Sequence, residues 1–173
     1  MKRQIRQSCF ETNSSSTHAI CIATDTLYNI PKTVSFGFGD FGWEIDKLTS
    51  RQERANYLYT CLGYCNLDEL KKYIEFISNT LYKNGVEDIN FESFKLGVYC
   101  WNNKTEIYFE PNDGYIDHGN ETKEFVDTVC SNEKILLDYL FSDKSFILTG
   151  NDNDETDVNI DVDYPHEEFY KGN

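Results

Sequence analysis

The stretch that decides the fold is SRQERANYLYTCLGYCNLDELKKYIEFISNTLYKNG, from Ser50 to Gly85. Apolar residues in its first half recur at intervals of three and four, which is the spacing of one helix face. Ser50 and Glu53 have the spacing of a capping box, which starts a helix. We therefore predict a helix from Ser50 to Tyr64. The residues of its expected buried face are Ala55, Leu58, Tyr59 and Leu62.

The second half of this stretch predicts another helix, from Leu67 to Lys83. Its apolar residues follow the same helical spacing, and Asn84-Gly85 is a natural C-terminal stop. Two long helices joined by a short turn should therefore supply much of the core. The residues of the second apolar stripe are Leu70, Tyr73, Ile74, Ile77 and Leu81.

Strand patterns lie on both sides of the helices. Residues 19–23 are a short apolar stretch typical of a buried strand, and residues 34–43 predict a strand broken by a turn, because they contain three glycines. Residues 94–101 and 106–109 predict a hairpin joined by residues 102–104.

Two shorter helices, over residues 122–130 and 133–141, and a strand over 145–149 complete the expected elements. Strands and helices are mixed without regular alternation, which favours an α+β fold with a mixed or antiparallel sheet and about four helices. We interpret residues 1–150 as one domain and residues 151–173 as an acidic C-terminal segment, either an edge strand or a tail.

The chain is strongly acidic: among 173 residues, 30 are acidic and 16 basic, a formal net charge of −14. On average such a surface repels nucleic acid, so we expect no free duplex DNA as partner, while a basic protein is favoured. The alternative is that the charge only provides solubility. Because the sequence has no apolar leader and no apolar run of bilayer length, we expect no membrane and a cytoplasmic location.

The six cysteines include no CxxC pair and no zinc-finger spacing, so we interpret them as mostly buried, reduced thiols. The sequence contains none of the fingerprints of P-loop, Rossmann, serine-hydrolase or HExxH zinc enzymes. A cysteine nucleophile has little support, because only Cys9 stands in a polar and basic context.

The densest group of polar side chains is the run from Asn13 to His18, with one amide, four hydroxyls and one imidazole. Hydroxyls and backbone N–H groups in a turn bind anions, and the upstream arginines favour phosphate. His18 can transfer a proton near neutral pH. The alternative is a serine-rich loop that only stabilises a turn. The expected phosphate- or substrate-binding residues are Arg3, Arg6, Asn13, Ser14, Ser15, Ser16, Thr17 and Asp117.

A second histidine, His118, follows Asp117 in a polar loop. If His18 and His118 met at one phosphate, one could accept the 2′-hydroxyl proton of RNA while the other protonated the leaving 5′-oxygen. The alternative is an ordinary exposed loop histidine.

Carboxylates close to predicted strands offer a metal site. Asp152 and Asp154 follow one strand, and Glu44 and Asp46 come after the glycine-rich stretch. Clustered carboxylates suit Mg²⁺ or Ca²⁺. The alternatives are a solvated acidic turn for the aspartates and the polar face of a strand for Glu44.

The segment Phe10–His18, FETNSSSTH, resembles the N-terminal signature of small proteins from phages and mobile elements of Gram-positive bacteria. Part of that group resembles the type II-A anti-CRISPR proteins. The other segments that look similar are residues 38–44, 57–60, 114–118 and 149–153.

This resemblance implies an inhibitor of a bacterial defence system, active in the cytoplasm of the bacterial host cell. Its implied partner is a CRISPR effector nuclease with its guide RNA, and its implied activity is cleavage or trimming of that RNA. His18 and His118 would transfer protons. The acids implied for orientation or metal binding are Glu11, Glu44 and Asp152, with Mg²⁺ as the candidate cofactor.

Three hypotheses follow from the sequence. The first is a ribonuclease that acts within a host-defence complex, and the second is an acidic inhibitor that binds and blocks a basic partner without chemistry. The third is a nucleotide-modifying enzyme whose Ser/Thr loop holds a pyrophosphate.

Overall fold

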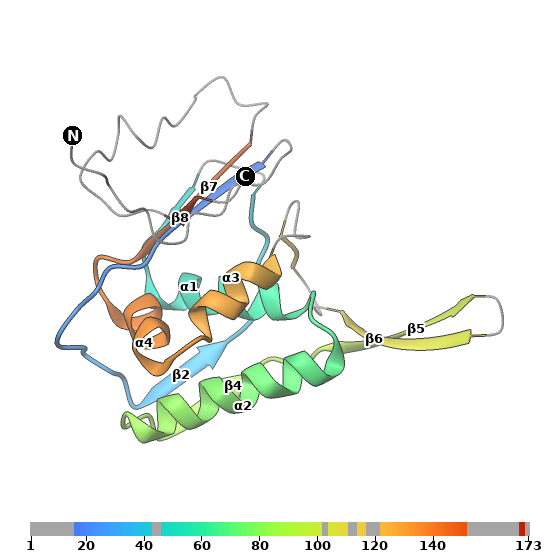
Figure 1. Ribbon diagram of the computed structural model, residues 1–173, viewed down its shortest axis with the longest axis horizontal. Helices are drawn as coiled ribbons and strands as arrows, with labels where there is room; N and C mark the ends of the chain where they lie inside the picture. The colour runs from blue at the N-terminus through green and yellow to red at the C-terminus, as the bar shows by residue number, and fades with distance from the viewer. Residues whose placement is uncertain are drawn as a thin grey trace.

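The computed structural model describes residues 16–42, 46–101, 104–110, 114–116, 122–151 and 170–171. In these residues four helices accompany a four-stranded sheet, a parallel strand pair and a hairpin (Figure 1). The predicted α+β class with four helices is therefore confirmed.

The largest sheet joins strands from both ends of the chain. Its order is β3 (Asp46–Leu48), β7 (Phe146–Asn151), β1 (Ser16–Cys21) and β8 (Tyr170–Lys171), and each neighbouring pair is antiparallel. The predicted strands at residues 19–23 and 145–149 are its two central members. Alternate residues of a strand lie on opposite faces, so this sheet contributes apolar residues to two separate clusters.

Helix α1 (Arg51–Leu62) begins with the predicted capping box between Ser50 and Glu53. It is buried on almost every side from Arg54 onward, because other elements pack around it. A helix surrounded in this way forms the centre of the core.

Helix α2 (Leu67–Lys83) has the predicted bounds. Asn66 and Glu69 form a second capping box at its start, and the chain turns away at Asn84 and Gly85. Helix α2 is amphipathic: its buried residues are Leu70, Tyr73, Ile77, Thr80 and Leu81.

Helices α3 (Thr122–Val129) and α4 (Glu133–Phe141) pack beside α1 (Figure 1). Strand β2 (Thr33–Phe36) pairs in parallel with β4 (Asp88–Phe91). The core lies where the four helices meet β2, β4 and one face of the large sheet.

Strands β5 (Lys95–Trp101) and β6 (Lys104–Glu110) form the predicted hairpin, whose turn residues 102–103 lie outside the described residues. Three strands were not predicted from the sequence: β3, β4 and β8. Each is short and too polar for a clear strand pattern, and each is recognised by its pairing with a partner strand.

Within the described parts of the chain, no helix combines the length and the apolar character that crossing a bilayer requires.

Candidate functional site

The side chain of His18, at the third position of β1, lies inside the core. It is 4% exposed, and its Nδ1 lies 2.9 Å from the hydroxyl of Tyr57 on α1. The two rings are tilted against each other, with their centroids 5.8 Å apart. His18 therefore links the large sheet to the central helix.

Aromatic rings enclose Tyr57 from two further directions. The ring of Phe41 meets it edge-on at 5.1 Å, and the ring of Phe125 meets it edge-on at 5.4 Å. Burial raises the pKa of the Tyr57 hydroxyl well above its ordinary value. The hydroxyl thus stays protonated at neutral pH, as a hydrogen-bonding group and not as a base.

Phe41 joins this cluster to a distant part of the chain. Its backbone N–H donates to the carbonyl of Tyr115 over 2.9 Å, and Phe41 forms a parallel β-bridge with Ile116. The two backbone segments can come this close because residue 114 is glycine. A Cβ on Gly114 would lie 2.7 Å from the backbone of Gly39. The bridge depends on a glycine at position 114.

One end of the large sheet collects three chain segments. Ser16, at the start of β1, pairs with Asn151 at the end of β7, and Asp46, at the start of β3, pairs with Thr149. Segments that are far apart in sequence therefore lie side by side at one place.

All five segments that carry the family resemblance converge on this junction through their described residues. His18 contacts Tyr57, Tyr57 contacts Phe41, and Phe41 pairs with Ile116. Thr149 lies opposite His18 in the neighbouring strand. We call this arrangement the Tyr57 junction. It is the candidate functional site, because described residues of all five segments meet there.

Most of the predicted site residues lie outside the described part of the chain, and only their sequence neighbours are placed. Ser16 and Thr17 belong to β1, where they pair with Asn151 and Gly150. The residues outside the description are Arg3, Arg6, Glu11, Asn13, Ser14, Ser15, Glu44, Asp117, His118, Asp152 and Asp154.

In the described ranges, no three His, Cys, Asp or Glu side chains are grouped so that they could share a metal ion. The aspartates predicted to hold Mg²⁺, Asp152 and Asp154, lie beyond these ranges. The metal site therefore stays a prediction.

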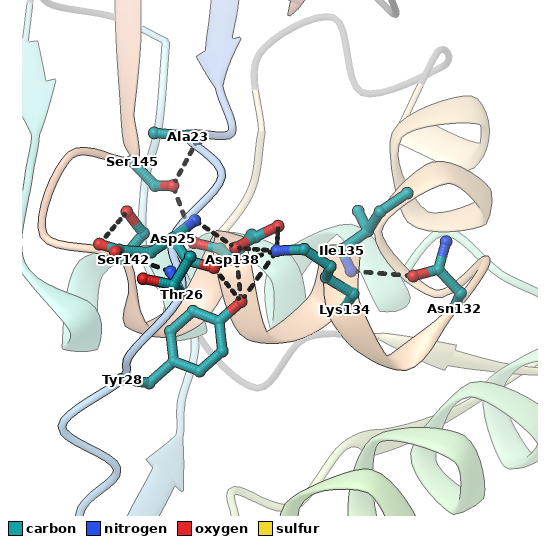
Figure 2. A network of polar contacts seen from close by, with 10 residues as sticks. All are labelled: Ala23, Asp25, Thr26, Tyr28, Asn132, Lys134, Ile135, Asp138, Ser142 and Ser145. Atoms are coloured by element: carbon teal, nitrogen blue, oxygen red, sulfur yellow. Dashed lines mark hydrogen bonds and ion pairs between the residues drawn. The ribbon is translucent and has the colours of Figure 1, made fainter.

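A polar network around Asp138 on α4 was not predicted from the sequence (Figure 2). Its carboxylate is nearly inaccessible. It accepts hydrogen bonds from the backbone N–H of Asp25 at 2.9 Å and from the Tyr28 hydroxyl at 2.6 Å, and Lys134 pairs with it at 2.9 Å. Figure 2 shows these groups converging on one carboxylate.

The Asp138 network fastens the segment after β1 onto α4. Ser145 extends it, since its hydroxyl accepts from the N–H of Ala23 and donates to the carbonyl of Asp138. Burial raises the pKa of Tyr28, so its phenol remains a neutral donor. Every polar group named here is engaged within the protein, which indicates a structural clamp.

A second unpredicted residue, Arg54 of α1, is completely buried. Its guanidinium donates to four backbone carbonyls and meets no carboxylate among these contacts. Burial lowers the pKa of Arg54, which still remains charged at neutral pH. It ties α1 to the end of α4, where a cation also complements the helix dipole. The accepting residues are Thr49, Leu140, Ser142 and Ser145.

The described cysteine thiols agree with the expectation of reduced, structural residues. Cys61, Cys65 and Cys130 are free thiols, and Cys21 is buried. Burial raises the pKa of Cys65 to about 11 and that of Cys130 to about 12. Because the thiolate is the nucleophile, neither residue is activated for catalysis.

The described surface also has an open groove beside β2, between α1 and α4. Two of its polar side chains have partners within the protein: Arg51 donates to the carbonyl of Asn29, and Gln52 donates to that of Ser35. The groove offers no group that is prepared for chemistry.

Comparisons of the chain with family models, with curated proteins and with solved structures find no match.

Proposed function

We propose that this protein is an anti-CRISPR-like inhibitor that docks, without chemistry, on the basic nucleic-acid channel of an RNA-loaded effector nuclease. The proposal combines the family resemblance with the way the chain distributes its negative charge. One observation carries it: the large sheet anchors both ends of the most acidic segment.

This segment contains eight acidic residues and neither lysine nor arginine between residues 152 and 168. Strand β7 leads into it at Asn151, and β8 resumes at Tyr170. Both strands pair with β1, one on each side. The two ends of the segment are therefore held by β7 and β8, the strands on either side of β1. A polyanion tethered in this way suits a cationic groove.

The burial of His18 favours docking over catalysis. A general acid or base must come within hydrogen-bond reach of its substrate. His18 is 4% exposed and hydrogen-bonded to Tyr57 inside the core. In this proposal, His18 stabilises the fold that presents the acidic segment.

RNA cleavage remains the second candidate, because the Tyr57 junction favours it. Ser16 pairs with Asn151 and Asp46 with Thr149 at one end of the large sheet, and Ile116 is linked to Tyr57 through Phe41. Such convergence is what a site built from distant polar segments requires.

The test is a titration of this protein against a type II-A effector nuclease loaded with guide RNA. Docking predicts that inhibition of DNA cleavage is complete at one inhibitor molecule per effector and that the guide RNA keeps its length on a denaturing gel. It also predicts that the affinity of the inhibitor for the effector falls as the salt concentration rises. Complete inhibition at substoichiometric protein, together with shortened RNA, contradicts docking and supports the second candidate.

Two charge variants locate the docking surface. Five Asp→Asn changes, at positions 152, 154, 157, 161 and 163, should weaken inhibition about tenfold or more, because complementary charge is lost. A control removes the same charge from exposed positions elsewhere and should change inhibition much less. Equal effects of the two sets would argue against the anchored segment. The control changes are Asp68→Asn, Glu75→Gln, Asp88→Asn, Glu124→Gln and Asp143→Asn.

A further inference from the structure

Strand β2 has a neighbouring strand along one edge only. Among the described strands it pairs with β4 and with no other (Figure 1). The carbonyls of Lys32 and Phe36 accept hydrogen bonds from backbone N–H groups on that side, at 3.1 and 2.9 Å. Because the N–H and C=O groups of successive strand residues point to opposite edges, Thr33 and Ser35 direct theirs away from β4.

Helix α1 caps part of this second edge. Nε2 of Gln52 donates to the carbonyl of Ser35 over 2.9 Å, and the N–H of Gly37 donates to Oδ1 of Asn56 over 3.1 Å. Gln52 also donates to Oδ1 of Asn56 over 2.7 Å, so the two side chains hold each other in place. Groups that cover a strand edge in this way prevent a further strand from pairing there. The cap closes the C-terminal half of the edge.

The N-terminal half of the edge has no such cap. In the described part of the chain, the N–H and C=O groups of Thr33 and the N–H of Ser35 have no hydrogen-bond partner. Both residues are exposed. Two donors and one acceptor in a row along an open strand edge are the groups with which an extended peptide pairs when it adds to a sheet.

The groove beside β2 limits the side chains that such a peptide can have. Its volume is about 200 Å³, and its lining includes the buried apolar residues Ala55, Leu140 and Phe141. Pockets for ordinary small-molecule ligands have volumes of about 300–1,000 Å³. The groove therefore suits a peptide with small apolar side chains.

Charge favours a basic peptide. The whole chain has a net charge of −14, which attracts cations from a distance. Arg51, the charged residue that lines the groove, is already paired with Asp143 at 3.2 Å and donates to the carbonyl of Asn29. The side chain of Asp143 is itself 85% exposed. A lysine or arginine next to the small apolar residues can therefore meet a carboxylate at the end of the groove.

We propose that the open edge of β2 binds a short, extended, basic peptide segment of a partner protein as an added antiparallel strand. One peptide residue exchanges two hydrogen bonds with Thr33, and the carbonyl two residues before it accepts from the N–H of Ser35. Antiparallel pairing is the more stable arrangement per residue. So few hydrogen bonds give weak binding. This site is separate from the acidic segment on which the proposed function depends.

Fluorescence anisotropy with the full chain tests this proposal. The probe is a fluorescein-labelled, C-terminally amidated peptide of alternating valine and threonine between two lysines. We expect saturable binding with a Kd below about 1 mM, which weakens as salt rises. The control is the same peptide N-methylated at its central amides, which keeps the side chains and the charge but loses the donors. It should bind about tenfold less tightly or worse.

Variants of the protein locate the binding edge. Thr33→Pro removes an N–H that donates to no described residue and blocks pairing at an edge, so peptide binding should be lost. Thr33→Val keeps the N–H and should bind like wild type. Gln52→Ala uncovers the carbonyl of Ser35 and should tighten binding several-fold. Urea unfolding of each variant shows whether it is folded, and Gln52→Ala tests the edge even if the proline variant is not.

Three results would overturn the proposal. The first is the absence of saturable binding by wild type up to about 1 mM peptide. The second is equal binding of the two peptides, which would show attraction by charge alone. The third is wild-type affinity in a folded Thr33→Pro variant, or in Gln52→Ala, because either result would place the peptide away from this edge.

Discussion

The Tyr57 hydroxyl and Nδ1 of His18 lie 2.9 Å apart in the core and join helix α1 to strand β1. Both residues belong to segments that carry the family resemblance. The pair therefore explains at least part of that sequence pattern as a requirement of folding.

The His18–Tyr57 hydrogen bond can be tested by removing one oxygen atom. Tyr57→Phe keeps the ring that packs against Phe41 and should lower the free energy of unfolding by about 1–2 kcal/mol. Urea denaturation measures the change. Tyr82→Phe is the control, because Tyr82 is 53% exposed, and it should stay within about 0.5 kcal/mol of wild type. Equal stability of Tyr57→Phe and wild type would remove the structural role of this bond.

Arg54 should be far more important for stability than its neighbour Arg51. Arg54→Met leaves four buried or partly buried carbonyls without their donor, and we expect a loss of about 3–5 kcal/mol. Arg51→Met removes only a partly exposed contact with Asp143 and the Asn29 carbonyl, and should cost about 1 kcal/mol or less. Similar unfolding midpoints for the two variants would contradict the assigned role of Arg54.

The sequence predicted those helices and strands whose periodicity, caps and stops lie within their own residues. The helix from Leu67 to Lys83 has its apolar stripe, its cap and its stop within the segment itself, and the structure gives the same bounds. Strand β8 has two residues and no such pattern, because its pairing with Ala19 and Ile20 defines it. Long-range pairing of this kind has no local sequence signature.

The candidate site shows the same contrast between local sequence signals and long-range contacts. The sequence singled out His18 because histidine can transfer protons, but burial of its ring depends on Tyr57, 39 positions away. Arg54 escaped notice because a charged residue in a helical pattern is normally assigned to the solvated face. Its burial depends on the carbonyls of Leu140 on α4 and of Ser145, which precedes β7.

The contact between Gly114 and Gly39 predicts an unequal cost for two glycine substitutions. Both Gly114 and Gly85 have positive φ, 111° and 95°, so alanine is strained at either position by about 1 kcal/mol. Only at position 114 would the new Cβ also meet backbone, whereas position 85 has open space. Gly114→Ala should therefore lower the thermal unfolding midpoint clearly more than Gly85→Ala. Equal midpoints would mean that the bridge between Phe41 and Ile116 tolerates separation.

Raised thiol pKa values predict loss of stability in mild alkali. Unfolded thiols ionise near their ordinary pKa of 9.0, whereas burial keeps Cys65 and Cys130 protonated up to about 11 and about 12. Above pH 9 the unfolded state therefore binds fewer protons than the folded state, so the free energy of unfolding falls as pH rises. From about pH 8 to about pH 10 we expect a loss of about 1–2 kcal/mol, which allows for the partial exposure of Cys65.

A paired comparison assigns this alkaline loss to the thiols. Cys65→Ala with Cys130→Ala should be less stable at neutral pH, because buried volume is removed, but its unfolding free energy should depend less on pH between about 8 and 10. Burial also raises the pKa of Cys61, which remains in the double variant and keeps part of the slope. Tyrosines of raised pKa, such as Tyr28 and Tyr139, ionise in the unfolded state only near pH 10, so their contribution comes mainly above this window. An unchanged slope in the double variant would show that other groups cause the loss, and urea titrations at three pH values suffice to measure it.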